Sequence, residues 1–203
     1  MPELSEVRWL TTNLQCLIGA KILASQVLRG ECILYEDVLY ETSKKAEESF
    51  NAIFGGSTIT AVTNKAKFVI TQAKTSEGKE PVILTHLGFT GWWVPDWANV
   101  SKPRKFIHNL SFNHSRLIIK TDRGSLYYLD PRLLGRNRIY TSLERAKGSR
   151  HLINMAPEAD TFEGISSLQE ALKKTRRRVR DVLLDQQILS GIGNYYLVQK
   201  RRH

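Results

Sequence analysis

The chain begins with residue types that could carry out covalent chemistry, namely Pro2, Glu3 and Glu6. An initiator methionine is usually removed ahead of a small residue, so we expect Pro2 to become the free N-terminus. Its amine then titrates near pH ~8, against ~10 for a lysine, so a useful fraction is neutral at physiological pH. Attack of this amine on an aldehyde or a sugar C1′ gives an iminium, which acts as an electron sink. Glu3 and Glu6 lie within reach to protonate a leaving group or ring oxygen and to shuttle protons.

The same hexamer is also an ordinary beginning for a helix, because proline, serine and glutamate often precede an apolar helical repeat. The repeat consists of Val7, Leu10, Leu14, Leu17 and Ile18, and Gly19 ends it. A helix here places Pro2 near the positive end of the helix dipole, which lowers the pKa of its amine. By itself the hexamer leaves both interpretations open.

The amino-acid composition indicates which kind of molecule the protein binds. The chain has 203 residues, 41% of them hydrophobic, and a formal net charge of +10. This charge favours a polyanion, nucleic acid ahead of an anionic membrane. Cys16 and Cys32 lack the spacing of a zinc site or a disulfide framework, so we expect no metal and no cofactor. With no long apolar run and no signal-like leader, we expect an intracellular protein: nuclear in a eukaryote, in the cytoplasm or nucleoid of a bacterium. We also expect a monomer.

A strand and then a second helix are expected after the first helix. We expect a strand over Lys21–Arg29 and a helix that runs from Ser43 to Gly55. Short β-rich runs come next, which predict a sandwich or barrel. They are Thr58–Thr63, Lys67–Ala73, Pro81–Thr85, Arg116–Thr121 and Ser125–Leu129. Hairpin turns are expected at 76–79 and 122–124. The stretch 92–107 reads as an irregular connection whose tryptophans pack, or else stack on bases.

Beyond Tyr140 the sequence becomes polar and then helical. Ser167 and Glu170 form a capping-box pattern that opens a helix over Leu168–Lys174, and helical spacing continues from Val179 to Gln187. A glycine turn over residues 189–196 separates two helices, where backbone N–H groups, with Asn194, could bind a DNA phosphate. The basic run from Lys173 to Arg180 is either a solvated helix face or a second phosphate contact.

Taken together, these segments resemble the formamidopyrimidine-DNA glycosylase / endonuclease VIII family of base-excision repair enzymes, from Pro2 to Tyr196. The resemblance implies that Pro2 forms a Schiff base at C1′ of a damaged nucleotide and that Glu3 is the acid. Lys67 lies in a segment (64–68) similar to the family's basic loop, and the resemblance implies that it contacts phosphate and assists catalysis.

Three further motifs of the chain are similar to DNA-contacting motifs of that family. Residues 85–91 resemble the motif whose apolar residue, here Phe89, fills the gap left by a flipped base. Residues 128–135 resemble the motif whose arginine, here Arg132, faces the orphaned base, with Leu134 where the family has an aromatic wedge. Residues 183–196 resemble the helix–two-turn–helix element that grips phosphates, and they include Gly193 and Asn194.

The resemblance implies an α+β fold. We expect an N-terminal β-sandwich with flanking helices over residues 1–140, a linker over 141–160 and an incomplete helix–two-turn–helix segment over 161–203. The chain departs from the family at Ser5, Arg8 and Gln199, and we expect it to be a shortened member without the family's C-terminal finger. Loss of the finger would remove phosphate contacts and reduce binding and turnover.

Three functions follow as hypotheses. The first is a glycosylase with AP-lyase activity on oxidised bases in double-stranded DNA. The second is a shortened member of the same family that binds DNA with little or no turnover. The third is a tautomerase-like enzyme that uses Pro2 as a base, and loss of DNA binding in Asn194→Ala would argue against it.

Overall fold

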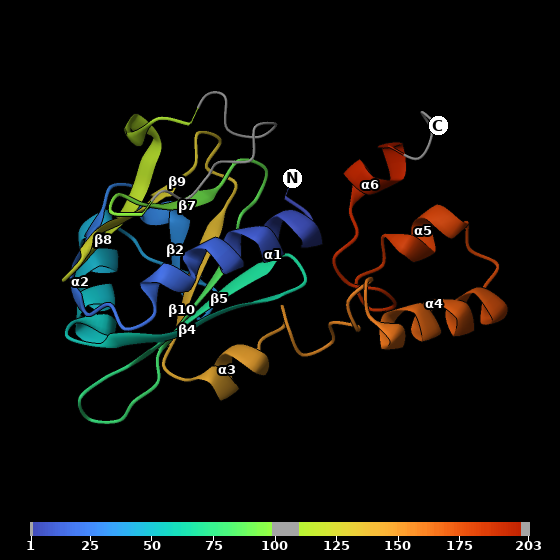
Figure 1. Cartoon of the computed structure of the whole chain (residues 1–203), viewed down its shortest axis with the longest axis horizontal. Helices are drawn as coiled ribbons and strands as arrows, with labels where there is room; N and C mark the ends of the chain where they lie inside the picture. The colour runs from blue at the N-terminus through green and yellow to red at the C-terminus, as the bar shows by residue number, and fades with distance from the viewer. Residues whose placement is uncertain (1, 99–109, 200–203) are drawn as a thin grey trace.

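The computed structural model describes residues 2–98 and 110–199, which form a β-sandwich joined to a smaller helical lobe (Figure 1). One sheet has the order β1-β8-β9-β7, with all its pairs antiparallel. Its strands are β1 (Ile22–Val27), β8 (Ser115–Thr121), β9 (Gly124–Leu129) and β7 (Trp92–Pro95). The apolar core lies between this sheet and a second one, which confirms the expected sandwich.

The second sheet has the order β3-β2-β10-β6-β5-β4. The pair β2–β10 is parallel and the remaining pairs are antiparallel. Its strands are β3 (Val38–Leu39), β2 (Ile33–Tyr35), β10 (Arg136–Tyr140), β6 (Val82–His86), β5 (Phe68–Lys74) and β4 (Thr58–Lys65). Because β5, β6 and β10 are neighbours in this sheet, the loops at their ends lie close together.

Helices cover the sandwich and build the second lobe. The helices on the sandwich are α1 (Leu4–Asn13), α2 (Ser43–Phe54) and α3 (Leu143–Lys147), and those of the second lobe are α4 (Phe162–Lys174), α5 (Val179–Leu183) and α6 (Asn194–Gln199). Short 3-10 segments occupy Leu14–Leu17, Gly30–Cys32 and Phe112–His114. Figure 1 shows the N-terminal end of α1 pointing toward the α4–α6 lobe. None of the described helices is long and apolar enough to span a bilayer.

The prediction of an irregular connection over residues 92–107 is wrong for its first four residues. Trp92–Pro95 forms β7 and pairs with β9, while residues 99–107 of that stretch lie outside the described residues. Trp92 packs near Trp9, with ring centroids 6.0 Å apart, and Trp93 packs near Tyr128 at 5.0 Å. Both faces of this strand are therefore covered, and these two tryptophans belong to the core and are not a surface for stacking bases.

The helix expected over Leu168–Lys174 begins earlier. Thr161 caps α4, and its hydroxyl accepts the N–H of Gly164 at 3.1 Å. The Ser167 hydroxyl donates to the carbonyl of Ile188 at 2.9 Å, so it links α4 to the segment after α5 and does not cap a helix. Helix α5 ends at Leu183, short of the expected Gln187. Three strands and one helix were not expected from the sequence, namely β2, β3, β10 and α3.

Candidate functional site

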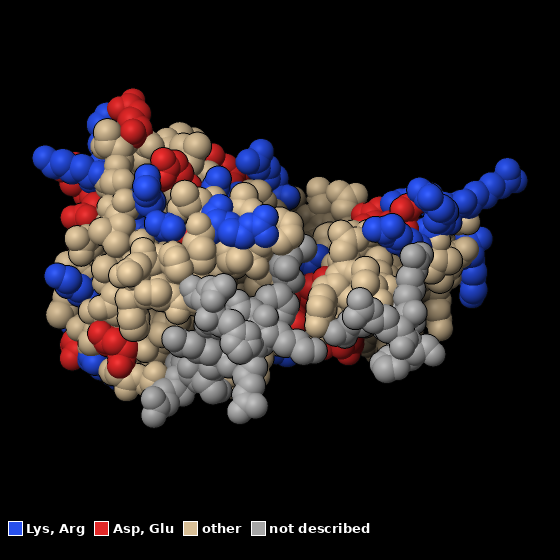
Figure 2. Space-filling model, turned by 90° about the horizontal axis from the view of Figure 1, so that it is seen from above, with Lys and Arg blue, Asp and Glu red and all other residues tan. Residues whose placement is uncertain are grey.

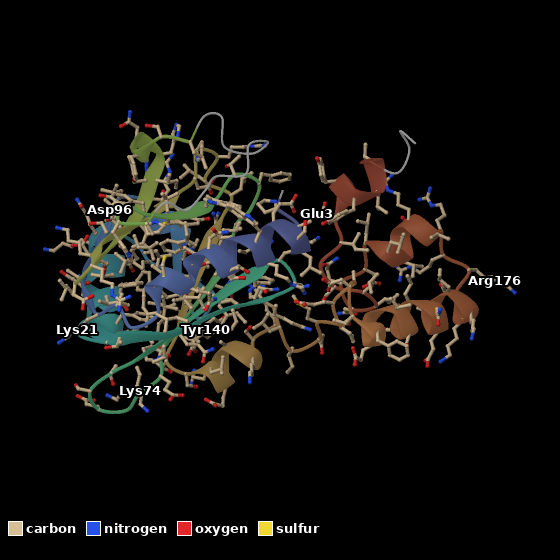
Figure 3. All side chains as sticks on the ribbon, in the orientation of Figure 1. Glu3, Lys21, Lys74, Asp96, Tyr140 and Arg176 are labelled. Atoms are coloured by element: carbon tan, nitrogen blue, oxygen red, sulfur yellow. The ribbon has the colours of Figure 1, made fainter. Side chains whose placement is uncertain are left out.

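Glu3 joins the beginning of α1 to the beginning of α6. Its side chain is buried, with 1% of its surface exposed. Its carboxylate accepts backbone N–H groups from Gly193 at 2.8 Å, Tyr195 at 2.8 Å and Tyr196 at 3.4 Å. The first N–H groups of a helix lack partners within the helix and carry partial positive charge, so they stabilise an anion. Figure 3 shows Glu3 at the end of α1 that faces the helical lobe.

The glycines of the turn before α6 allow this close approach. A Cβ on Gly193 would lie 2.3 Å from Oε1 of Glu3. Gly191 has a φ of +97°, and a Cβ there would lie 2.8 Å from the Cβ of Leu4. The Leu4 N–H donates to the carbonyl of Gly191 at 3.1 Å. The N–H groups of this turn were expected to bind a DNA phosphate, and in this structure those of Gly193 and Tyr195 donate to the carboxylate of Glu3.

Lys67 lies in the two-residue turn between β4 and β5. Its half-buried ammonium donates to the carbonyl of Ile192, in the same glycine turn. Burial lowers the pKa of Lys67 below its ordinary value, and the negative charge of Glu3 opposes this shift. Gln186 also donates to the carbonyl of Ile192 at 3.0 Å and accepts the N–H of Gly191 at 3.0 Å, so it helps to shape the turn.

Glu6 and Pro2 complete the N-terminal part of the cluster. The carboxylate of Glu6 accepts the backbone N–H of Glu3 at 3.0 Å, which is the pattern of a capping box. Pro2 is buried and directly precedes Glu3 in the chain. Asn194 is exposed at the first position of α6, and its amide oxygen accepts from Arg180 at 3.2 Å. Residues from both ends of the chain therefore meet around one turn.

The three residues expected to enter the duplex, called here the wedge residues, lie in two adjacent loops; they are Phe89, Arg132 and Leu134. Phe89, in the loop after β6, is 47% exposed, and Leu134, in the loop before β10, is 43% exposed. The guanidinium carbon of Arg132 lies 4.9 Å from the centre of the Phe89 ring, within the range of a cation–π contact. An exposed apolar side chain beside an exposed arginine is suited to enter a stacked duplex and hydrogen-bond a base edge.

Asp130 holds these two loops together, a role that the sequence analysis missed. It is 1% exposed and its Oδ2 accepts the N–H of Gly135 at 2.7 Å. Its Oδ1 accepts the Thr90 hydroxyl at 2.6 Å and the Arg132 N–H at 3.2 Å. Asp130 stands inside the motif that carries Arg132, so its position in that motif was the available signal.

The strand register brings the wedge loops to the same end of the sheet as Lys67. Phe68, which follows Lys67, pairs with His86 at the end of β6, and His86 pairs with Arg136 at the beginning of β10. The chain therefore reaches this end of the sheet three times, with Lys67, Phe89 and Leu134 in the three adjoining loops. Among residues 2–98 and 110–199, no group of three His, Cys, Asp or Glu side chains could hold a metal ion.

The comparisons with known proteins point to one family. Residues 1–137 match the family described as the formamidopyrimidine-DNA glycosylase N-terminal domain. The chain is 30% identical to a formamidopyrimidine-DNA glycosylase of Bartonella quintana, across 98% of this chain and 65% of the relative. It is 29% identical to that of Bacillus subtilis, across 97% of this chain and 64% of the relative. The chain thus spans just under two thirds of the length of these relatives.

Solved structures agree at the level of the fold. A complex between Lactococcus lactis Fpg and DNA containing an abasic site superposes with a TM-score of 0.73 at 22% identity, covering 96% of this chain and 65% of that one. A structure of MutM with DNA containing carbocyclic 8-oxo-G has a TM-score of 0.73 at 20% identity, covering 98% of this chain and 67% of that one.

Proposed function

Since the chain belongs to the formamidopyrimidine-DNA glycosylase / endonuclease VIII family, we propose that it is a DNA-repair glycosylase with AP-lyase activity on damaged bases in duplex DNA. The observation that carries the proposal is the convergence of two groups of residues. One group, Pro2, Glu3 and Lys67, gathers at the glycine turn, and the wedge loops lie at the same end of the sheet. Relatives named as DNA glycosylases and structures solved with damaged DNA support this choice.

The proposed chemistry begins once Met1 has been removed. The Pro2 nitrogen attacks C1′ of the damaged nucleotide, the bond from C1′ to the base breaks, and the departing base takes a proton. Glu3 or Glu6 supplies that proton. The Pro2 nitrogen then gives up its own proton, and O4′ takes up a proton as the C1′–O4′ bond breaks, which opens the sugar ring and leaves C1′ joined to Pro2 as an iminium. The resulting iminium acidifies C2′, so loss of a C2′ proton expels the 3′ phosphate by β-elimination. Water then releases the sugar fragment from Pro2.

In this proposal the wedge residues act on the duplex before the chemistry. Phe89 and Leu134 cover the bases left unstacked by flipping, and Arg132 hydrogen-bonds the orphaned base. Asn194, which is exposed at the first position of α6, contacts a phosphate of the damaged strand, whereas the N–H of Gly193 is already donated to Glu3. We propose that the protein acts as a monomer, and its bacterial relatives favour the cytoplasm or nucleoid as its location.

Borohydride trapping tests the proposal. Protein whose Met1 removal has been verified by mass spectrometry should form a covalent adduct with duplex DNA that contains an abasic site. The matched control is the same chain with an uncleaved N-terminal extension, in which the Pro2 nitrogen is an amide and should form no adduct. Absence of an adduct from the processed protein, with binding intact, would rule out the lyase mechanism.

A second candidate function is DNA binding with little or no turnover. It is favoured by the state of the N-terminal residues, because Pro2 is buried and the Glu3 carboxylate accepts backbone N–H groups of α6. A salt-sensitive gel shift with damaged duplex but without strand cleavage would support this candidate. Asn194→Ala is the informative variant, since it should weaken the shift only if the turn contacts DNA.

A further inference from the structure

Glu158 belongs by its backbone to the helical lobe. The segment that contains it runs beside the residues that lead into the glycine turn, and Glu158 and Ser190 form an isolated parallel bridge. Ser190 donates its N–H to the carbonyl of Pro157 at 3.0 Å and accepts the N–H of Ala159 at 3.0 Å. Ser190 is fully buried. The backbone of Glu158 is therefore fixed relative to the turn.

The side chain of Glu158 reaches the sandwich. It is 14% exposed, and its Oε1 accepts the backbone N–H of Ala66 at 2.6 Å and the side-chain amide of Asn64 at 3.2 Å. Its Oε2 accepts from the guanidinium of Arg8, on α1, at 2.6 Å. Arg8 also pairs with Asp160. One carboxylate thus joins the helical lobe to both the β4–β5 turn and α1.

Glu158 contacts the segments on both sides of the hydrogen bond between Lys67 and Ile192. Ala66 is buried and has a φ of +50°, a conformation that residues with a side chain rarely adopt, so the turn needs an outside partner. The Ala66 N–H finds that partner in Glu158. The next residue, Lys67, donates to the carbonyl of Ile192, which lies in the turn that the backbone of Glu158 adjoins.

We propose that Glu158 is a positioning residue that sets the place of the Lys67 ammonium against the glycine turn, with Arg8 balancing its charge. The inference rests on the proposed function. A displacement of about 1 Å in a catalytic group can cost about 100-fold in rate. Loss of Glu158 should therefore slow the chemical step much more than it weakens DNA binding.

Single-turnover cleavage of abasic duplex at saturating protein tests the inference. Glu158→Ala removes the acceptor of the Ala66 N–H and should be about 100-fold slower, with a nearly unchanged Kd. Glu158→Gln keeps an oxygen in the same place and should stay within about fivefold of the parent, since it loses mainly the pair with half-exposed Arg8. Glu163→Gln, an exposed glutamate on α4, is the control and should match the parent. Equal losses in the Ala and Gln variants would overturn the inference.

A double-variant cycle separates this role from a general loss of structure. If Glu158 acts through Lys67, then Lys67→Ala with Glu158→Ala should be no slower than Lys67→Ala alone. Additive losses would contradict the inference. If Glu158→Ala does not fold, Glu158→Asp replaces it, because the shorter carboxylate keeps its charge and withdraws from Ala66.

A readout without DNA distinguishes failure of this inference from failure of the proposed function. Hydrogen exchange of the Ala66 amide should become faster in Glu158→Ala and Glu158→Asp and stay slow in Glu158→Gln. Unchanged protection in all three variants would overturn the positioning role even in an active enzyme. Conversely, an inactive parent with this exchange pattern would leave the role intact and reject only the glycosylase.

Discussion

The Glu3 carboxylate accepts backbone N–H groups at the beginning of α6, while the Glu3 backbone N–H donates to Glu6. The resemblance to the family implies that Glu3 is the catalytic acid. In the structure the oxygen atoms of its carboxylate accept hydrogen bonds that join the two lobes. A proton transfer by Glu3 therefore requires a change in at least one of these contacts. Glu6 is half-buried next to it, and we propose it as the alternative proton donor.

At the residue scale, we expect Glu3→Gln to lower the free energy of unfolding by about 1–3 kcal/mol, because hydrogen bonds to a buried charged group are lost. In addition, the new amide NH2 would face N–H donors. Urea denaturation at pH 7 measures the change. Glu80→Gln, at an exposed site near the β5–β6 hairpin, should keep the parental stability. A Glu3→Gln variant as stable as the parent would contradict the joining role of this carboxylate.

At the scale of elements, the loop after β6 and the loop before β10 lie at one end of the six-stranded sheet and carry the wedge residues. Hydrogen bonds to Asp130 tie the loop after β6 to the loop before β10. Gly88, with a φ of +62°, allows contact between them, since a Cβ there would lie 2.6 Å from the backbone nitrogen of Gly135. The wedge residues are thus presented by a pair of loops that share one buried carboxylate.

We expect Asp130→Ala to weaken binding to a duplex with an abasic site by about tenfold, which corresponds to about 1.4 kcal/mol. The Gly135 N–H would lose its partner and the loops that carry Phe89 and Arg132 would separate. Fluorescence anisotropy with labelled duplex measures the Kd. Glu77→Ala, exposed in the β5–β6 hairpin, serves as the control. Parental affinity in the Asp130 variant would show that the wedge loops do not need this tie.

The loop after β6 should also respond to acid through His86. Burial lowers the pKa of His86 to about 4, and the positive charges of Arg138, Lys67 and His151 act in the same direction. Neutral Nδ1 accepts the Gly88 N–H at 3.3 Å, and protonation would remove this acceptor. The unfolded chain binds the proton from pH ~6.5 downward, so stability falls between pH ~6.5 and ~4.

The expected loss over that interval is about 3 kcal/mol for this one group. His86→Asn keeps an acceptor for Gly88 but does not titrate, so its stability should fall less between pH 7 and pH 4.5. Urea denaturation of both proteins at the two pH values gives the difference. Parallel losses in the parent and the variant would mean that His86 is not buried in its neutral form.

At the scale of the whole molecule, basic side chains are unevenly distributed. Figure 2 shows Lys and Arg gathered at the outer end of the helical lobe, whereas on the sandwich they are interspersed with Asp and Glu. Arg176, between α4 and α5, lies at that outer end in Figure 3, far from Lys74 on the sandwich. Arg177 and Arg178 pair with Asp185 and Asp181. Residues 161–199 contain six Lys and Arg against four Asp and Glu, so a net positive charge remains on this lobe. The chain as a whole has a formal net charge of +10, which favours a polyanion as its partner.

We expect the DNA affinity to fall steeply with salt, as it does when phosphate contacts release counterions. If Arg180 contacts a phosphate, Arg180→Gln should reduce the magnitude of the slope of log K against log salt by about 1. Lys74→Gln, at the other end of the molecule, should leave the slope unchanged. The measurement is a set of binding isotherms from about 50 to 200 mM salt. A slope that responds equally to both variants would indicate nonspecific attraction with no defined path for DNA.

The sequence by itself determined the family, the sandwich and the beginning of the first helix. The family came from the resemblance of several motifs. The sandwich and the helix depend on local patterns, such as the short β-rich runs and the apolar repeat that follows Pro2, and such patterns act through neighbouring residues. The strand β10 was missed because Arg136–Tyr140 carries two arginines and an asparagine, which are uncommon on a central strand. Its place between β2 and β6 comes from packing.

Only the tertiary structure decided the partners of Glu3, Lys67 and Glu158. The Glu3 carboxylate meets the N–H of Gly193 from 190 positions away, and Glu158 meets that of Ala66 from 92 positions away. No periodicity or spacing encodes such pairs, because they form only when the two lobes dock and buried polar groups must find partners. Local sequence thus sets the elements, and the need to satisfy buried charge sets how they meet.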